Sequence, residues 1–115
     1  MILKKVTEWW RKIQRKHAFK RVLIIESMTE LPARLNSNLY IVRRGGHDRR
    51  AVFNCPCKCG RRIDLNLVKA GGPQWIFRLE KCKATIEPSV WLLEERCQSH
   101  FFIRENNVEW VQLEV

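Results

Sequence analysis

The spacing of cysteine and histidine constrains this chain more than any other feature. Cys55, Cys57 and Cys59 lie within five residues, and Cys97 and His100 follow about forty residues later. A zinc ion takes four thiolate or imidazole ligands at tetrahedral angles, and proteins usually supply them from two short segments that the fold brings together. The sequence therefore predicts a zinc site formed by two distant parts of the chain.

Five candidate ligands compete for four positions. Cys55, Cys59, Cys97 and His100 would form a Cys3His site with a slightly enlarged first knuckle. Cys57 can replace either of its neighbours, because a Cys-x-Cys pair also chelates, so the spacing leaves the spare thiol unassigned. Iron is an alternative to zinc, since thiolate-rich tetrahedral sites accept both metals. The competing interpretation is a set of reduced, buried thiols with a surface histidine, but cysteines that alternate with proline and lysine are not typical of a core.

Length and cysteine usage indicate one small domain in a reducing compartment. A chain of 115 residues buries a modest core, so a structural metal would contribute to its stability. The odd cysteine count and the clustered spacing of the first three argue against a disulfide framework. The opening residues lead into charges rather than an apolar segment, and no long uncharged apolar stretch follows. We therefore expect a cytoplasmic protein with neither a signal peptide nor a transmembrane segment.

Positive charge is concentrated near the start of the chain. The formal net charge is +10, and residues 1–21 contain eight lysines and arginines against Glu8 alone. A second basic run, Arg43-Arg44 and Arg49-Arg50, flanks a glycine-rich turn. Such patches attract phosphate backbones, anionic lipid or acidic proteins, and the competing interpretation is a solvated face that keeps the chain soluble.

Periodicity predicts one helix followed by β structure. Apolar residues recur at spacings of three and four over residues 3–17, which indicates a basic amphipathic helix. Short apolar runs between turn residues then predict strands. These strands are expected near residues 22–25, 39–42, 50–53, 63–67, 75–79, 84–86, 101–103 and 108–113, with Pro88 ending the sixth. The predicted class is α+β: a small antiparallel β domain clipped by zinc over residues 22–115, preceded by the basic helix within residues 1–21.

Turns and isolated residues complete this prediction. Gly45-Gly46 and Asn106-Asn107 are expected hairpin turns, because glycine and asparagine tolerate positive φ. Cys82 is expected to be a structural cysteine within a strand. Core positions are favoured over an exposed interaction surface for three tryptophans, Trp75, Trp91 and Trp110.

The segment around the first three cysteines resembles the signature of a family of small uncharacterised bacterial zinc-binding proteins. In that family a Cys-Pro-Cys-Gly-Cys-Gly segment precedes a Leu-Asn-Leu strand, here residues 55–60 and 65–67. Lys58 stands where glycine is usual, and Asn106-Asn107 replaces a residue-plus-glycine turn, but neither change removes a candidate ligand. The resemblance covers about residues 20–111; its further matches are Pro73 with Trp75, residues 86–91, residues 97–103 and Val108 with Trp110.

The resemblance implies zinc binding and a role beside ubiquitin-like conjugation components, next to which some members are encoded. We therefore expect a structural zinc module that is not an enzyme. It would act as an adaptor that binds a partner protein, such as a ubiquitin-like modifier or its conjugating enzymes.

Two other functions stay open at this point. A zinc domain could bind nucleic acid through its basic N-terminal arm. An enzyme could use an open zinc position or the spare thiol, for instance Cys57. Catalysis is disfavoured because no histidine or asparagine partner can be assigned to that thiol. Asp64 and Glu87, the carboxylates near the signature, are better explained as polar residues on strand faces.

Overall fold

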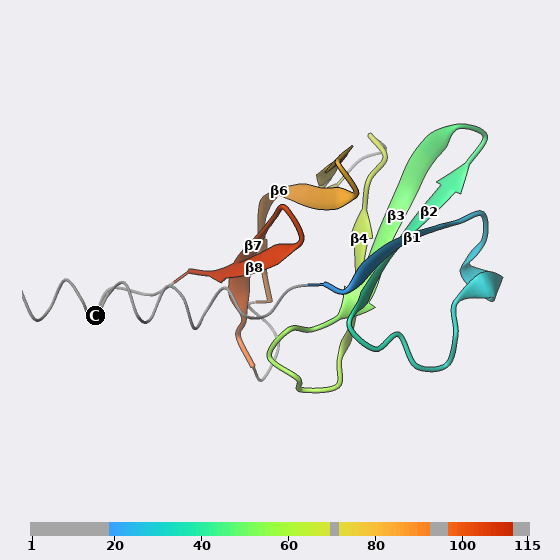
Figure 1. Ribbon diagram of the computed structural model, residues 1–115. Coiled ribbons are helices and arrows are strands. Elements are labelled where there is room, and N and C mark those ends of the chain that lie inside the picture. Colours follow the sequence, from blue (N-terminus) through green and yellow to red (C-terminus); the bar gives the residue numbers. More distant parts are fainter. Residues whose placement is uncertain (1–18, 70–71, 93–96, 112–115) are drawn as a thin grey trace, which may run out of the picture.

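Two four-stranded β-sheets form the part of the chain that the structure describes, residues 19–69, 72–92 and 97–111 of a computed structural model (Figure 1). In these residues the one helical element is a 3-10 turn, η1 (Met28–Glu30). The first sheet contains β1 (Arg21–Ile25), β2 (Asn38–Arg44), β3 (His47–Asn54) and β4 (Arg62–Asn66), in that order. The second contains β5 (Ile76–Glu80), β6 (Lys83–Trp91), β7 (His100–Arg104) and β8 (Asn107–Trp110), also in order.

The predicted α+β class is wrong, because the described residues are all-β. Their apolar runs are short and bounded by turns, which suits strands rather than amphipathic helices. The basic helix expected over residues 3–17 lies outside the described residues. Among the residues that are described, no helix has the length and apolarity needed to cross a membrane.

Strand direction also differs from the expectation at one place. β1 pairs with β2 in parallel, whereas the other pairings are antiparallel. The reason is the connection over residues 26–37, which carries the chain back before β2 begins. Ser27 and Glu30 form a capping box at η1 within this connection. Leu31 and Leu35 of the same connection then pack on one face of the first sheet, against Tyr40 and Val52.

The two sheets pack against each other around a shared core, in which Phe53 is central. Phe53 is fully buried and makes edge-to-face contacts with Phe19, at 5.3 Å between ring centroids, and with Phe101 of β7, at 6.2 Å. Ile41, from the centre of the first sheet, lies in the same cluster. The last residues of β3 therefore hold the two sheets together, directly before the first cysteine.

We expect Phe53→Ala to lower the free energy of unfolding by about 3–5 kcal/mol, because the substitution leaves a cavity between the sheets. Urea unfolding followed by tryptophan fluorescence measures this change. Ile76→Ala is the matched control, since that side chain is 58% exposed and its loss should change stability by less than about 0.5 kcal/mol. Similar losses for both variants would contradict the assignment of Phe53 to the core.

Three tight hairpins use turn residues in the left-handed region. Gly45-Gly46 joins β2 to β3 with φ of 60° and 77°, as predicted. The β7–β8 turn is Glu105-Asn106, with φ of 49° and 67°, so it begins one residue before the predicted turn. Cys82 was expected in a strand, but Lys81-Cys82 forms the third turn, with φ of 50° and 63°, and the thiol is exposed.

β6 continues through Pro88, where the sequence predicted its end. Between the pairs Ile86↔Ile103 and Val90↔Phe101, three residues of β6 oppose one residue of β7. This irregularity accommodates proline, which has no N–H to contribute to the ladder. It also changes the course of the strand at the next residue, Ser89.

Candidate functional site

The first three cysteines lie on a tight loop that begins where β3 ends. Cys55 N donates to Arg61 O over 2.8 Å, which closes the loop, and Lys58 N donates to Cys55 O over 3.0 Å, which forms a turn inside it. Cys55 is buried, whereas Cys57 and Cys59 are exposed. The loop therefore presents one inner thiol and two outer thiols from a single short segment.

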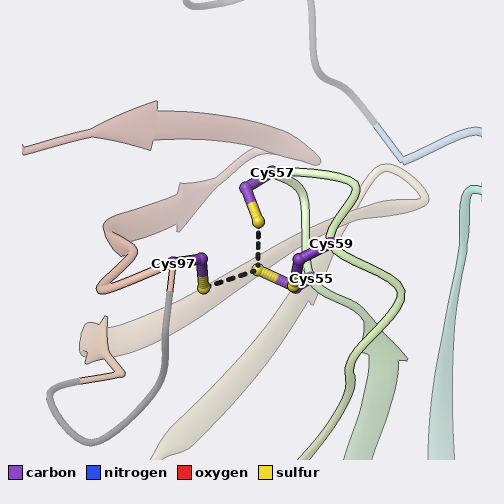
Figure 2. Close-up of side chains that lie close together, drawn as sticks. All are labelled: Cys55, Cys57, Cys59 and Cys97. Carbon is purple, nitrogen blue, oxygen red and sulfur yellow. Dashed lines mark hydrogen bonds between the residues drawn. The ribbon is translucent and has the colours of Figure 1, made fainter.

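Cys97 joins these three thiols from the segment before β7, so both sheets contribute to the cluster (Figure 2). The four Sγ atoms lie within 4.8 Å of one another. Cys55 Sγ is 3.3 Å from Cys57 Sγ and 4.0 Å from Cys97 Sγ. Sulfur atoms around a tetrahedral zinc ion are about 3.8 Å apart, given a Zn–S bond of about 2.3 Å. The described geometry is therefore compatible with a metal ion held by four thiolates.

Backbone N–H groups two residues downstream support three of these sulfur atoms. The backbone N–H of Cys57 donates to Cys55 Sγ, that of Arg61 to Cys59 Sγ, and that of Ser99 to Cys97 Sγ. Hydrogen bonds of this kind favour the thiolate over the thiol. At Cys59 the Arg61 N–H lowers the pKa, but the hydrogen bond with the Cys57 side chain and burial outweigh it and raise the pKa overall. In the loop and in the Cys97 segment alike, the N–H group that contacts the sulfur atom belongs to the second residue after the cysteine.

The thiols of Cys97 and Cys55 differ in acidity. Hydrogen bonds from the Ser99 side chain and backbone lower the pKa of Cys97 to about 7. Burial raises the pKa of Cys55 to about 12, although the hydrogen bonds with the Cys57 backbone and the Ser99 side chain oppose the rise. A buried thiolate is stable only with a compensating positive charge, and a metal cation at the centre of the cluster would supply one.

Lys58 occupies a left-handed conformation, with φ of 68°. Glycine adopts this conformation without the steric cost that other residues carry. This conformation accounts for the glycine that is usual at this position in the family that the segment resembles. We expect Lys58→Gly to raise the free energy of unfolding by about 1 kcal/mol, as measured by urea unfolding. Lys83→Gly, in β6, is the control and should instead lower the free energy of unfolding by about 0.5–1 kcal/mol. An equal loss of stability in both variants would contradict backbone strain at Lys58.

His100 was a candidate ligand, but the structure does not bring it into the thiol cluster. It is the first residue of β7, and its Nε2 lies 2.8 Å from Ser89 Oγ of β6. Its Nδ1 is buried and has no hydrogen-bond partner among the described residues. The bulge in β6 thus places a serine hydroxyl against a histidine ring, with both side chains half-buried.

Two aromatic side chains flank this histidine. Trp91 pairs with His100 across the strands and stacks on its ring, with centroids 4.5 Å apart and planes 7° apart. The ring of Phe102 lies 6.5 Å away. Trp91 is 48% exposed, so the core position expected for it is wrong, whereas Trp75 and Trp110 pack against the core while partly buried.

Comparison with known proteins places this site in context. A family model described as "Bacterial ubiquitination-like system serine protease (BubE)" matches residues 26–111, about three quarters of the chain. The chain belongs to the BubE family. This result supports the link to ubiquitin-like systems that the resemblance implied. No curated protein and no solved structure gave a significant match.

The BubE description changes the balance among the functions considered. It names a serine protease, which points to an enzyme and is at odds with the expectation of a non-enzyme. It lends no support to nucleic-acid binding. Part of the basic run is also neutralised locally, since Arg43 pairs with Asp48 at 2.6 Å and Arg50 with Asp64 at 2.8 Å.

Sequence reasoning missed Ser89. No nucleophile motif such as Gly-x-Ser-x-Gly surrounds it, and its partner His100 was assigned to the metal. The one local signal was a proline directly before a serine inside a predicted strand region, because proline there indicates a bulge.

Proposed function

We propose that this chain is a serine protease of a ubiquitination-like system, with Ser89 as the nucleophile and His100 as the general base. The observation that carries the proposal is the 2.8 Å contact between Ser89 Oγ and His100 Nε2, in a family whose description names a serine protease. A nucleophile within hydrogen-bond reach of a base is the arrangement that acyl transfer requires.

The contact defines how the proton moves. For Ser89 Oγ to donate to His100 Nε2, the neutral imidazole must carry its proton on Nδ1. As Oγ attacks the carbonyl carbon of a peptide bond, Nε2 takes the hydroxyl proton, and it then gives that proton to the leaving amine. The acyl group stays on Ser89 as an ester until water, activated by the same histidine, releases it.

Trp91 supports this cycle from the open side of the site. Its stacked ring fixes the plane of the imidazole, a task that a carboxylate performs in a Ser-His-Asp triad. The face of an indole ring also attracts a cation, worth about 0.5–1 kcal/mol at exposed sites. The stack therefore favours the imidazolium that forms when His100 takes the proton.

The four cysteines would hold zinc in a closed site, with Cys55, Cys57, Cys59 and Cys97 as ligands. Four protein thiolates leave no position for water or substrate, so such an ion would supply folding energy rather than reaction chemistry. This ligand set leaves His100 free to act as a base. Its support is the geometry of the four sulfur atoms.

The natural substrate, on this proposal, is a polypeptide of the ubiquitination-like system, so the expected protein partner is cut rather than merely bound. The adaptor role predicted from the resemblance stays a prediction, as does a cytoplasmic location. The two roles differ in one respect, because only the protease needs Ser89.

A fluorophosphonate probe, which reacts with activated serine hydroxyls, tests the proposal. Intact-mass analysis should show one adduct per chain for the wild type and none for Ser89→Ala. Ser37→Ala, an exposed serine in the first half of the chain, should label like the wild type. Absence of labelling in the folded wild type, or equal labelling of Ser89→Ala, would overturn the proposal.

A further inference from the structure

We propose that metal binding at the four-cysteine cluster positions His100, so that Ser89 is reactive only while the cluster is filled. The inference rests on the proposed function and adds a control to it. The metal would be required for hydrolysis without touching the substrate, and a chelator would therefore inhibit a serine enzyme.

The physical link is the short segment from Cys97 to His100. Cys97 contributes a thiol to the cluster at one end of this segment, and His100 contributes the base at the other. Two residues separate them. A displacement of Cys97 by an ångström or more cannot be absorbed over so short a length without moving the histidine backbone, since each residue spans only about 3.3–3.6 Å when extended.

Ser99 fastens the middle of the segment to the cluster. It is a buried polar residue with 5% of its surface exposed. Its hydroxyl donates to Cys97 Sγ over 3.2 Å and lies 3.6 Å from Cys55 Sγ. The side chain directly before the base therefore touches one thiol from each sheet.

Backbone hydrogen bonds connect Ser99 and His100 to the neighbouring strands. Leu92 N donates to Ser99 O over 2.8 Å, and Val111 N donates to His100 O over 2.9 Å. Trp91, which stacks on the imidazole, pairs with His100 in the same register. The position of Ser99 thus sets both the start of β7 and the alignment of the histidine with Ser89.

An empty cluster cannot hold this arrangement equally well. Its four sulfur atoms would lie within 4.8 Å of one another with no cation between them. Without the ion, no metal–sulfur bond would join Cys97 to the thiols of the first loop, so the two segments would be connected there by the weaker hydrogen bonds between the thiols and at Ser99. We expect the segment to relax away from the first loop, and misplacement of a catalytic group by about 1 Å costs on the order of 100-fold in rate.

The experiment measures the rate of fluorophosphonate labelling of Ser89 in the full chain. Protein loaded with zinc, stripped with a chelator, and reloaded with cadmium is compared, and folding is checked by tryptophan fluorescence. We expect labelling to fall by at least about 10-fold on stripping and to recover with cadmium, which also favours thiolate ligands. A stripped protein that stays folded and labels at the zinc-loaded rate would overturn the inference.

Because loss of a structural metal is also expected to unfold much of the chain, a second variant that keeps the metal decides the matter. Ser99→Ala should keep one metal ion per chain, because every thiol remains. Its maximal labelling rate should fall by about 10-fold while the probe concentration for half-maximal rate stays unchanged, whereas Ser37→Ala should alter neither. An unchanged maximal rate in Ser99→Ala would refute the positioning role. Failure of the zinc-loaded wild type to label would instead refute the proposed function itself.

Discussion

His100→Gln should slow the reaction of Ser89 with a fluorophosphonate by about 10²–10⁴-fold while leaving the fold intact. Glutamine keeps a side-chain oxygen near Ser89 Oγ but cannot accept the hydroxyl proton at neutral pH. The 2.8 Å contact with His100 Nε2 would then become an ordinary hydrogen bond. The labelling rate at pH 7.5, measured by intact mass over time, gives the size of the effect.

Two comparisons make this prediction specific to the base. His47→Gln changes an exposed histidine in β3, next to the glycine turn, and should label at the wild-type rate. Ser89→Ala should not label at all, so the residual rate of His100→Gln measures the Ser89 hydroxyl without its base. A His100→Gln variant within about twofold of the wild-type rate would contradict the role of His100 as base, because general-base catalysis contributes far more than that.

Cys55→Ser should remove the bound metal and unfold most of the chain at 25 °C. Structural zinc contributes about 10–16 kcal/mol in small zinc domains, which is comparable to or larger than the total stability of a typical domain. Cys55 is also the buried member of the cluster, next to Phe53 in the core between the sheets. Elemental mass spectrometry of the purified protein, together with urea unfolding, measures both consequences.

Cys82→Ser is the matched control for this loss. That thiol is exposed in the β5–β6 turn, so its substitution should leave the metal content at one zinc per chain and change stability by less than about 0.5 kcal/mol. Iron in place of zinc, a wild type without metal, or a folded Cys55→Ser protein would each contradict a closed structural zinc site.

Periodicity was sufficient for most strands but not for their arrangement. The alternation over residues 63–67 predicted β4, and Gly45-Gly46 predicted the β2–β3 turn, because both signals are local. The parallel pairing of β1 with β2 depends on where the connection over residues 26–37 packs, and no local pattern encodes that. Cys82 was misplaced for a related reason, since neither lysine nor cysteine is a typical residue for positive φ.

The thiol cluster could be predicted from residue type and spacing, whereas the contact between Ser89 and His100 could not, because it lies beside a strand bulge. Cysteine spacing alone predicted that the loop at residues 55–59 meets Cys97, and the structure brings these thiols together. The assignment of His100 followed from a Cys-x-x-His spacing, but β7 begins at this residue, and its ring points to β6 instead. Ser89 meets His100 beside the irregularity of β6 around Pro88, and such an irregularity is a tertiary feature that no local pattern encodes.

The most direct test of the account is to locate the acyl group during turnover. The zinc-loaded chain would be mixed with a ubiquitin-like modifier extended at its C terminus by a short tag, quenched in acid and mapped by mass spectrometry. The account predicts release of the tag and an ester between the modifier and Ser89 Oγ, absent in Ser89→Ala. A thioester on Cys57, or tag release that persists in Ser89→Ala, would contradict it.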